Sequence, residues 1–537
     1  MVNELRGHSC GEPIWRRYRS VSPPLAGVTL GSSNIYGVPR LMNDVAIFDT
    51  VIVGNGALGL ALGFRLTQRR QRVAVIGPST RRFSASQAAG AMNGTFGEVT
   101  RDLLSSSHGR QKLELDIAAT DVWDSWCDEI VSMAGESHAL RRKDGTTIIL
   151  NGGGTDAVDT ENFVAIREAL TKYGRSFQQL EGHEVPWVTA QGGNRPFQGL
   201  HIPDEHSIIT PVYMRTLEKA FVNAGGILID GTVENVISKG ATSVASVEFG
   251  DGKSVVGEHL VLAAGALSHE LLASALPDVG PYVPPVTSGY GASVLLSHGV
   301  VPPPPSVIRT PNRAFACGLH AVPREDGIYV GATNKIQEKP QVFAHVPDLH
   351  ALLERAMRQM HAGFGTSGVL AVNVGNRPVP VDGFPLIGAI PDSRIWMLTG
   401  TYRDGFHQSP FLADRVADAL IDGKHDPLFD SFAPVRAPIQ SGRRDAIIAT
   451  AVEHALAVGF EAEWRVSTRW PARIADLLTT KYQDALNDLH GTITPPPDVL
   501  VCMSDNEWLR RKLRAYYDVY SNKTPALQDN RLQFDVA

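Results

Sequence analysis

The strongest structural signal in the chain is Asp49-Thr50-Val51-Ile52-Val53-Gly54-Asn55-Gly56-Ala57-Leu58-Gly59. An apolar strand runs into glycines in G-x-G-x-x-G spacing, and a helix-like segment follows. Gly54 permits a tight turn, Gly56 lets the backbone approach a pyrophosphate, and Gly59 lets the helix pack closely on the strand. A second apolar strand over Val73–Ile76 completes a β-α-β unit. The unit predicts a bound dinucleotide at the helix N-terminus, and a glycine-rich turn without a ligand is the structural alternative.

The second strand ends without the acidic residue that usually binds the ribose hydroxyls of a dinucleotide. Gly77 stands at that position and is followed by Pro78 and Ser79. This departure removes one ribose contact and does not decide which dinucleotide binds. Ser79 is the candidate hydroxyl partner in place of the acid.

The composition is that of an ordinary globular protein too long for one core. The chain has 537 residues, of which 43% are hydrophobic and 20% charged, and this length predicts two or three domains. A formal net charge of -6 and a pI near 6.3 give no electrostatic reason to expect nucleic acid. The four cysteines, Cys10, Cys127, Cys317 and Cys502, form no metal-ligand spacing. We therefore expect free thiols, no metal site and a reducing compartment.

The N-terminal extension over residues 1–44 shows neither a membrane span nor a targeting signal. No apolar run approaches the roughly 20 residues that cross a bilayer. Arg16 and Arg17 form a pair, but Ser20-Val21-Ser22-Pro23-Pro24 follows instead of the apolar run of an export signal. We expect a cytoplasmic protein without membrane contact, whose extension drapes over the body or is disordered.

The C-terminal part of the chain has a purely helical pattern. Apolar residues at helical spacing span 447–456, and Gly459 is the expected C-cap. Pro471 opens a second helix, and Ser504 with Glu507 forms a capping box ahead of a third. These patterns predict a helical appendage without indicating its role.

Five further segments occur along about 390 residues and match one family in order. They are Ser84–Met92, Pro203–Pro211, Ala263–Ser268, Val322–Thr333, and Asn376–Gly388 with Gly400–Gly405. Together they resemble the D-amino-acid-oxidase-like FAD-dependent oxidoreductases, and within them the glycine oxidase branch. Each segment is only moderately specific, and the order of all five carries the resemblance.

The resemblance implies an α/β fold with two sheet domains. One is an FAD-binding Rossmann-like domain with a doubly wound, mainly parallel sheet, and the other is an antiparallel-sheet substrate domain. The expected FAD-binding domain covers 45–130, 205–282 and 375–434, the substrate domain covers 131–204 and 283–374, and the helical appendage covers 435–537.

The resemblance also implies a non-covalent FAD, because no cysteine lies where the sarcosine oxidase branch attaches the cofactor. Small residues over 84–92 suit backbone that must lie against a flat ring. For Met92 a core position is the preferred explanation. The expected FAD contacts are Gly54, Gly56, Ala57, Leu58, Gly59, Ser84, Ser86, Ala88, Ala89, Gly90, Met92, Val233, Ala264, Gly265, Gly400, Arg403, Asp404, Gly405 and Phe406.

The substrate is expected to bind through its carboxylate. A guanidinium grips a carboxylate through two parallel charge-assisted hydrogen bonds, and the family places such an arginine at Arg377. Arg403, Tyr402 and His320 complete the expected catalytic set. The structural alternatives are an ion pair for Arg377, a flavin-loop role for Arg403 and packing for Tyr402. His320 either has a functional role, donating to a carboxylate or titrating near neutral pH, or is a satisfied edge residue.

Departures from the branch cluster at the substrate end. Thr401 replaces a histidine, Asp404 an asparagine, Pro380-Val381 a Thr-Pro pair, and His320 an aromatic hydroxyl. Asp404 would place negative charge near the flavin edge. The simplest inference is a specialised substrate instead of glycine itself.

The favoured function is FAD-dependent oxidation of the C–N bond of an amino acid or related amine. Hydride passes from the α carbon to flavin N5, the imine product hydrolyses, and O2 is reduced to H2O2. The enzymatic alternatives are a dehydrogenase with another acceptor, a specialised biosynthetic flavoenzyme acting on a non-standard amine, and a monooxygenase. A monooxygenase is disfavoured because the sequence shows no second dinucleotide fingerprint. A tRNA-modifying or scaffold role is disfavoured because the sequence shows no basic stripe. The branch often forms homo-oligomers.

Overall fold

The computed structural model describes residues 40–42 and 45–521, apart from 191, 239, 241–243, 314–317, 462–463 and 465. The expected N-terminal extension lies almost wholly outside the described residues, as do Cys10 and Cys317. Cys127 and Cys502 are free thiols, as expected.

The first sheet is parallel at its centre and carries the β-α-β unit. β10, β3, β2 and β13 run parallel in that order, and β12 and β11 extend them as an antiparallel meander. β21 is parallel to β13 and pairs with β20, while β1 pairs with β2. The strands are β1 (Arg40–Met42), β2 (Val45–Val53), β3 (Val73–Gly77), β10 (Ile227–Asp230), β11 (Val233–Ile237), β12 (Ala245–Phe249), β13 (Ser254–Leu262), β20 (Leu386–Ala389) and β21 (Ile395–Thr399).

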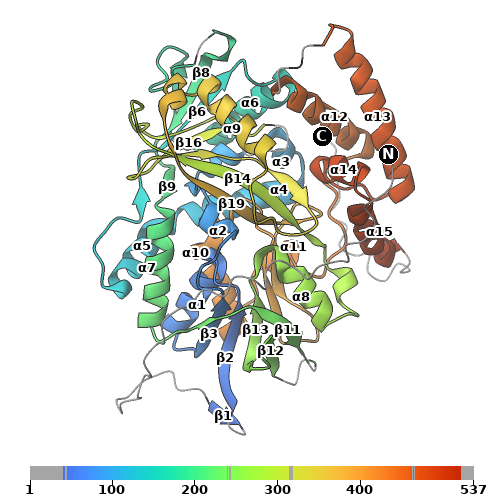
Figure 1. Cartoon of the computed structure of the whole chain (residues 1–537). Coiled ribbons are helices and arrows are strands. Elements are labelled where there is room, and N and C mark those ends of the chain that lie inside the picture. The colour runs from blue at the N-terminus through green and yellow to red at the C-terminus, as the bar shows by residue number, and fades with distance from the viewer. Residues whose placement is uncertain are drawn as a thin grey trace, which may run out of the picture. The chain divides into compact units, whose positions relative to one another are not determined.

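Both faces of this sheet are buried, which explains why its strands read as unbroken apolar runs. Ile52 and Val75 point into one core, while Val51 and Ile76 point into another. Helices cover the first face, and Figure 1 shows α1 and α10 beside the strands. The covering helices are α1 (Ala57–Gln68), α5 (Trp123–Ala134), α7 (Thr210–Asn223) and α10 (Gly405–Asp422) on this face and α8 (Ser268–Ala275) on the other.

The second sheet is mostly antiparallel and is built around the long strand β14. β16 and β17 form a hairpin that includes most of the family-matching segment Val322–Thr333. The expected domain boundary at residue 375 falls inside β19, which pairs with β14 along its length. The strands are β6 (Thr146–Asn151), β7 (Gln178–Glu181), β8 (Pro196–Ile202), β14 (Val286–Leu296), β15 (Val307–Arg309), β16 (His320–Pro323), β17 (Ile328–Gly331), β18 (Lys335–Gln337) and β19 (Val369–Pro380).

Short elements join the two sheets. A small third sheet consists of β4 (Met92–Asn93), β5 (Arg141–Arg142) and β9 (His206–Ile208). The remaining body helices are α2 (Ala85–Ala88), α3 (Arg101–Ser105), α4 (Ser107–Thr120), α6 (Glu161–Lys172), α9 (Val346–Gln359) and α11 (Pro427–Ser431).

The described part of the C-terminal region contains four helices where the sequence pattern predicts three. They are α12 (Arg444–Glu461), α13 (Trp470–Leu489), α14 (Pro497–Ser504) and α15 (Glu507–Ser521), drawn in orange to red in Figure 1. Pro471 lies in the first turn of α13, as predicted.

Two predicted caps are wrong. α12 continues through Gly459, because this glycine is buried against Trp464 and needs no left-handed conformation. Ser504 instead ends α14 and bonds the carbonyl of Val501. The amide oxygen of Asn506 accepts from Leu509 N at 3.2 Å and caps α15.

A buried ion pair fastens these helices to the body. Arg436 donates to both carboxylate oxygens of Asp382 at 2.9 and 2.8 Å, and the two side chains are 8% and 3% exposed. The hydroxyl of Tyr516 on α15 donates to the carbonyl of Arg436 at 2.9 Å. Val381 belongs to the same core as α12–α15. The helices therefore anchor the turn between β19 and β20.

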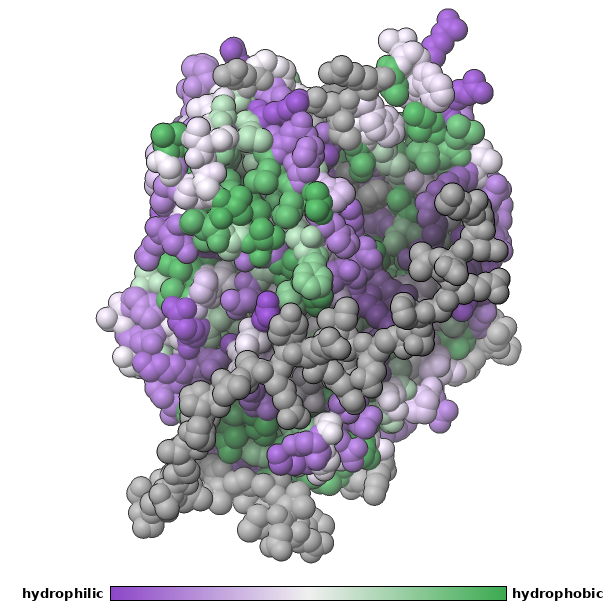
Figure 2. Space-filling model, viewed as in Figure 1, coloured by the Kyte–Doolittle hydropathy of each residue, from purple (hydrophilic) through white to green (hydrophobic). Residues whose placement is uncertain are grey.

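The second sheet also exposes apolar surface. Figure 2 shows apolar side chains gathered on the face drawn over this sheet. Three apolar residues are each more than half exposed: Val346 at the start of α9, and Val369 and Leu370 on β19. No described helix is long and apolar enough to cross a membrane.

Candidate active site

A cavity of about 450 Å³ lies between the two sheets. The first sheet contributes the turn after β2, the end of β13 and the start of α10, and the second contributes β14, the β16–β17 hairpin and β19. This volume is within the range of small-molecule and cofactor sites. The arrangement follows the rule that ligands bind beyond the carboxyl ends of parallel strands.

The three glycines of the turn after β2 have different roles. Gly54 has a φ of +118°, and a methyl group there would overlap the carbonyl of Ala263. A methyl group at Gly59 would overlap the carbonyl of Gly54, so this glycine serves helix packing and does not line the cavity. At Gly56 an added Cβ would meet only the Ser86 hydroxyl at 3.1 Å. Gly56 therefore leaves open space at the N-terminus of α1, where a pyrophosphate fits.

Asn55 explains the missing acid at the end of β3. A side chain at Gly77 would overlap that of Asn55, whose amide donates to the carbonyl of Pro78 at 3.0 Å. Ser79 does not line the cavity, so its expected ribose contact is not supported; its backbone N–H donates to Asp230 at 2.8 Å. Arg81 lines the cavity instead and donates to the carbonyl of Asn55 at 2.8 Å.

Most of the expected FAD contacts line the cavity. Gly400 does not; its φ is +74° and an added Cβ would lie 2.6 Å from Pro380, so it serves the turn after β21. Those that line it are Gly54, Gly56, Ala57, Leu58, Ser84, Ser86, Ala88, Ala89, Gly90, Met92, Val233, Ala264, Gly265, Arg403, Asp404, Gly405 and Phe406.

The small-residue loop is fixed against the hairpin of the second sheet. The hydroxyl of Tyr329 donates to the carbonyl of Ala88 at 2.9 Å, and Arg324 donates to the carbonyl of Gly90 at 2.6 Å. A Cβ at Gly90 would lie 2.7 Å from the Tyr329 ring. Small residues are therefore required where this loop lies between the hairpin and the cavity.

Arg377 lines the part of the cavity that belongs to the second sheet. One guanidinium nitrogen contacts the carbonyls of Gly289 and Thr333 at 3.5 and 3.3 Å and the side-chain oxygen of Asn334 at 3.3 Å. These contacts orient the guanidinium through neutral groups. Across the described residues, no carboxylate forms an ion pair with it. Its charge is therefore available to a bound anion.

Tyr402 and Arg403 lie beside Arg377 in the cavity lining. The Tyr402 hydroxyl bonds the Asn334 amide and accepts from Arg403 at 3.2 Å. The Arg403 guanidinium lies 4.7 Å from the centre of the Tyr402 ring. Burial raises the pKa of Glu98, but the Arg309 and Arg403 charges outweigh it and lower that pKa to about 2. Arg403 therefore faces a permanent negative charge.

His320 lies in the cavity as a neutral imidazole. Burial, with the Arg309 and Arg377 charges, lowers its pKa to about 3. Its Nδ1 lies 3.2 Å from the carbonyl of Gly318, which assigns the ring proton to that nitrogen. The lowered pKa and this hydrogen bond favour the alternative in which His320 is a satisfied edge residue over one in which it titrates near neutral pH. The same hydrogen bond leaves no ring N–H for a substrate carboxylate.

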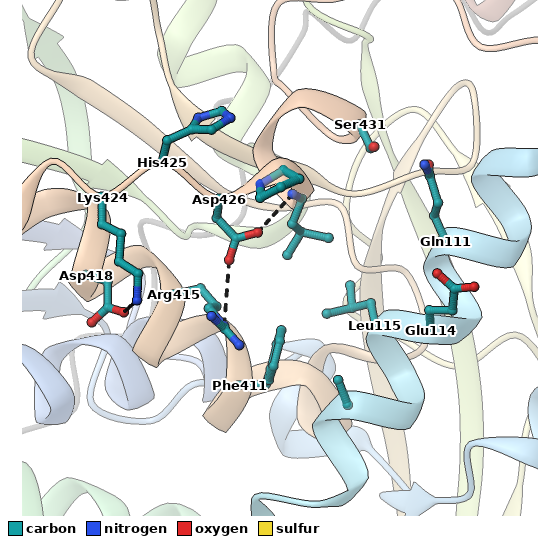
Figure 3. A pocket seen from close by; sticks show the side chains of 13 residues that line it. Gln111, Glu114, Leu115, Phe411, Arg415, Asp418, Lys424, His425, Asp426 and Ser431 are labelled. Atoms are coloured by element: carbon teal, nitrogen blue, oxygen red, sulfur yellow. Dashed lines mark hydrogen bonds and ion pairs between the residues drawn. The ribbon is translucent and has the colours of Figure 1, made fainter. Parts of the chain in front are cut away.

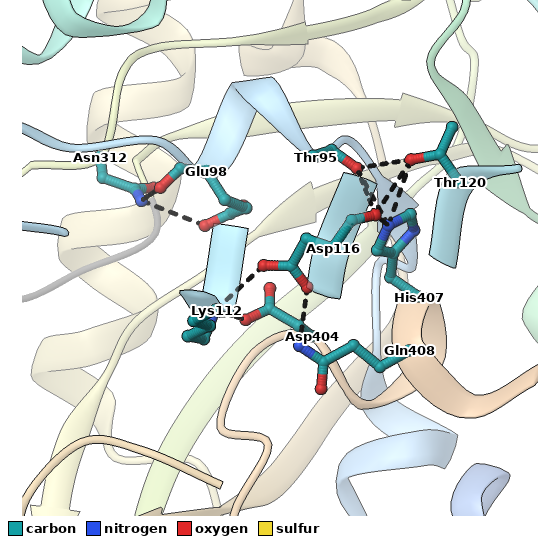
Figure 4. A network of polar contacts seen from close by, with 9 residues as sticks. All are labelled: Thr95, Glu98, Lys112, Asp116, Thr120, Asn312, Asp404, His407 and Gln408. Atoms are coloured by element: carbon teal, nitrogen blue, oxygen red, sulfur yellow. Dashed lines mark hydrogen bonds and ion pairs between the residues drawn. The ribbon is translucent and has the colours of Figure 1, made fainter. Parts of the chain in front are cut away.

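Sequence analysis missed a polar network beside the cavity. Figure 4 shows Lys112 and Asp116 from α4 meeting Asp404 and Gln408 at the start of α10. The i,i+4 spacing of Lys112 and Asp116 is visible in the sequence, but nothing local relates it to Asp404. The pairing depends on how α4 and α10 pack.

A second cavity, of about 410 Å³, lies between α4 and α10 (Figure 3). Four of its charged groups form two pairs: Arg415 lies 3.6 Å from Asp426, and Lys424 lies 3.1 Å from Asp418. None of the expected site residues lines it. Within the described part of the chain, no cluster of His, Cys, Asp and Glu could hold a metal ion.

The fold and the first cavity define a class: a dinucleotide-binding α/β protein with a second, antiparallel sheet over the ligand. The open space at Gly56 and the small-residue loop fit FAD. Residues 49–419 match the family model described as FAD dependent oxidoreductase. The chain belongs to this family and is an FAD-dependent oxidoreductase.

Individual relatives are similar over the same region. The bifunctional protein ThiO/ThiG of Nostoc sp. is 26% identical over 399 residues, covering 72% of this chain and 54% of that protein. The glycine oxidase of Geobacillus kaustophilus is 26% identical over 396 residues, covering 70% and 93%. The crystal structure of glycine oxidase from Geobacillus kaustophilus superposes with a TM-score of 0.62 at 23% identity, covering 73% of this chain and 99% of that one. This chain thus spans about half the length of the bifunctional relative.

Proposed function

We propose that this protein oxidises the C–N bond of an amino acid or related amine that carries a carboxylate. The observation that supports this most directly is Arg377, a cavity-lining guanidinium held by neutral groups. The similarity to a glycine oxidase adds to it. A scaffold function would leave this charge without a purpose inside a cofactor cavity.

Arg377 positions the substrate. Two parallel N–H groups of a guanidinium bind both oxygens of a carboxylate and fix its plane. With the carboxylate fixed, the α carbon of the substrate has one orientation in the cavity, and positioning of this kind supplies much of the rate. When bound, FAD accepts the hydride that leaves the α carbon.

Among the expected catalytic residues, none is proposed to take the amine proton. His320 is too weak a base at a pKa of about 3. We therefore propose that the amine reacts in its neutral form. On this basis kcat/KM rises with pH until the free amine is fully deprotonated.

We propose O2 as the acceptor and H2O2 as the product, with FAD held without a covalent bond. A dehydrogenase that passes electrons to another carrier is the second candidate, because the departures at Thr401 and Asp404 alter the surroundings of the cofactor. Stoichiometric peroxide release during turnover supports the oxidase. Turnover only with an added artificial acceptor supports the dehydrogenase.

The substitutions Arg377→Ala and Arg377→Lys test the proposal. Loss of the bidentate pair should raise KM for a carboxylate substrate by roughly 100-fold or more, because truncating one partner of a buried charge pair costs about 2–5 kcal/mol. Lysine should restore only part of this, since its ammonium cannot bind both oxygens. FAD content should stay unchanged. Arg443→Ala is the control, because its side chain is 85% exposed. Unchanged kinetics in Arg377→Ala would remove this residue from the substrate site.

A further inference from the structure

A buried ionic cluster joins α4 to the start of α10. The Lys112 ammonium pairs with Asp404 and lies 3.2 Å from Asp116. The amide of Gln408 donates to the second oxygen of Asp116 at 2.6 Å. The three charged side chains are 11%, 11% and 6% exposed. This cluster is the one drawn at the centre of Figure 4.

The cluster presents its negative side to the cavity. Asp404 and Asp116 line the cavity, whereas Lys112 does not. Two carboxylates share one ammonium, so the cluster carries one net negative charge when both are ionised. Lys112 bonds one oxygen of Asp404, and no described donor bonds the other. The exposed negative charge therefore lies toward the cavity, with the positive charge behind it.

The position of the cluster relates it to the ring end of the cofactor. The turn at Gly56 belongs to the first sheet and receives the pyrophosphate, and Arg377 belongs to the second. The residues between these two points would hold the redox-active ring of FAD. Asp404 directly follows Arg403, whose guanidinium donates to the Tyr402 hydroxyl at 3.2 Å, and Tyr402 and Arg377 both bond the side chain of Asn334.

We infer that Asp404 and Lys112 together set the reduction potential of the bound flavin. Asp404 disfavours the negative charge that the flavin gains on reduction, and Lys112 offsets part of this effect. The inference rests on FAD binding alone and holds for any substrate. On this inference, the aspartate at position 404, where the branch has asparagine, tunes the cofactor.

Neighbouring charges make the effect pH-dependent. Burial raises the pKa of Asp404, Asp116 and Glu98 raise it further, Lys112 opposes them, and the result is about 7. The charged and titratable groups around Asp404 come from three places. They are Lys112 and Asp116 on α4, Glu98 in the short turn before α3, and Arg403 and His407 around the start of α10. Asp404 loses its charge as pH falls through 7, so the flavin potential should rise more steeply there.

The test measures the two-electron potential of the FAD-loaded full chain against reference dyes from pH 6 to 8.5. Asp404→Asn should raise the potential at pH 8 by at least about 30 mV, which is a tenfold change in the reduction equilibrium. It should also abolish the change of slope near pH 7. In the Asp404→Asn background, where position 404 no longer titrates, Lys112→Met should lower the potential at pH 8, and Lys112→Arg should restore it. A purely structural role would not make the potential shift upward when the Asp404 charge is removed and downward when the Lys112 charge is removed.

The control is Lys481→Met, which breaks a lysine–aspartate pair of 2.6 Å on the C-terminal helices and should leave the potential unchanged. If Lys112→Met does not fold, Asp404→Asn decides alone, since the amide keeps the size of the carboxylate. An Asp404→Asn protein with an unchanged or lower potential overturns the inference. So does loss of FAD from it, because removing negative charge should not weaken binding of an anionic cofactor. Failure of every amine to reduce the enzyme would refute the proposed function and leave this measurement intact.

Discussion

The protonation state of His320 decides what the substrate meets in the cavity. The ring is parallel to Tyr329 within 14°, and its Nδ1 proton is held by the carbonyl of Gly318. A neutral imidazole in this arrangement offers a lone pair and an apolar face. Under the proposed function, recognition of a carboxylate then depends on Arg377, with Arg403 balanced by the ionised Glu98.

We predict that His320→Asn leaves the pH profile of kcat/KM between pH 5 and 9 unchanged in shape. A new or missing inflection near pH 6.5 would show that the ring titrates in the working enzyme.

Stability gives a second readout of the same protonation state. Because the folded pKa of about 3 lies below the unfolded value of about 6.5, the unfolded chain binds the proton first. The stability that depends on keeping His320 neutral is fully present above about pH 6.5 and is lost as pH falls toward 3. His320→Asn should therefore make the urea midpoint fall less as the pH is lowered.

Single residues differ in how far sequence alone predicts them. Gly54 and Gly56 lie in a motif whose spacing fixes their chemistry, Arg377 is placed by the family resemblance, and all three line the cavity. The ionisation of His320 and the pairing of Lys112 depend on burial and on contacts between distant segments. Such contacts leave no local pattern in the sequence.

At the scale of elements, the turn between β2 and α1 combines two different demands for glycine. Gly54 faces the backbone of Ala263, so any side chain there conflicts with the fold itself. Gly56 faces the cavity, where an added Cβ meets only the movable Ser86 hydroxyl at 3.1 Å, so a side chain there conflicts mainly with a ligand.

This difference predicts opposite outcomes for two valine substitutions. Gly56→Val should give a folded protein, with a normal far-UV circular dichroism spectrum, that is purified colourless and does not take up FAD. Gly54→Val should fail to fold, because its φ of +118° and the overlap with Ala263 are both unfavourable for a β-branched residue. A yellow Gly56→Val protein with a normal flavin spectrum would exclude the turn from the cofactor site.

Element types were predictable where apolar periodicity is strong, as in the β-α-β unit. Their ends were less predictable. Gly459 and Ser504 fit cap patterns, yet tertiary packing continues one helix past the glycine, and Asn506 caps the other. Both cap signals are common in sequences, and packing decides which of them is used.

At the scale of the whole molecule, the C-terminal helices are part of the oxidoreductase body. They bury Val381 in their core and pair Arg436 with Asp382 at the turn that follows the Arg377 strand. The sequence indicated helices there, but their contact with the turn after β19 is visible only in the structure.

We predict that Arg436→Met lowers the free energy of unfolding by about 3–5 kcal/mol, because it leaves the buried Asp382 carboxylate without its partner. Urea unfolding followed by tryptophan fluorescence measures this. Arg443→Met removes an exposed arginine that pairs with Asp445 and should change the midpoint little. Equal effects of the two substitutions would show that the Arg436 pair does not fasten the helices.

The most direct measurement is an anaerobic visible-absorption titration of the purified protein with matched amines. Glycine, sarcosine and the two alanine enantiomers are compared with methylamine, dimethylamine and ethylamine, which lack the carboxylate. We expect an oxidised-flavin spectrum that at least one carboxylate-bearing amine bleaches and its decarboxylated counterpart does not. A protein that is colourless and refuses added FAD, or a flavin bleached equally by both members of a pair, would contradict an FAD site in which Arg377 holds the substrate.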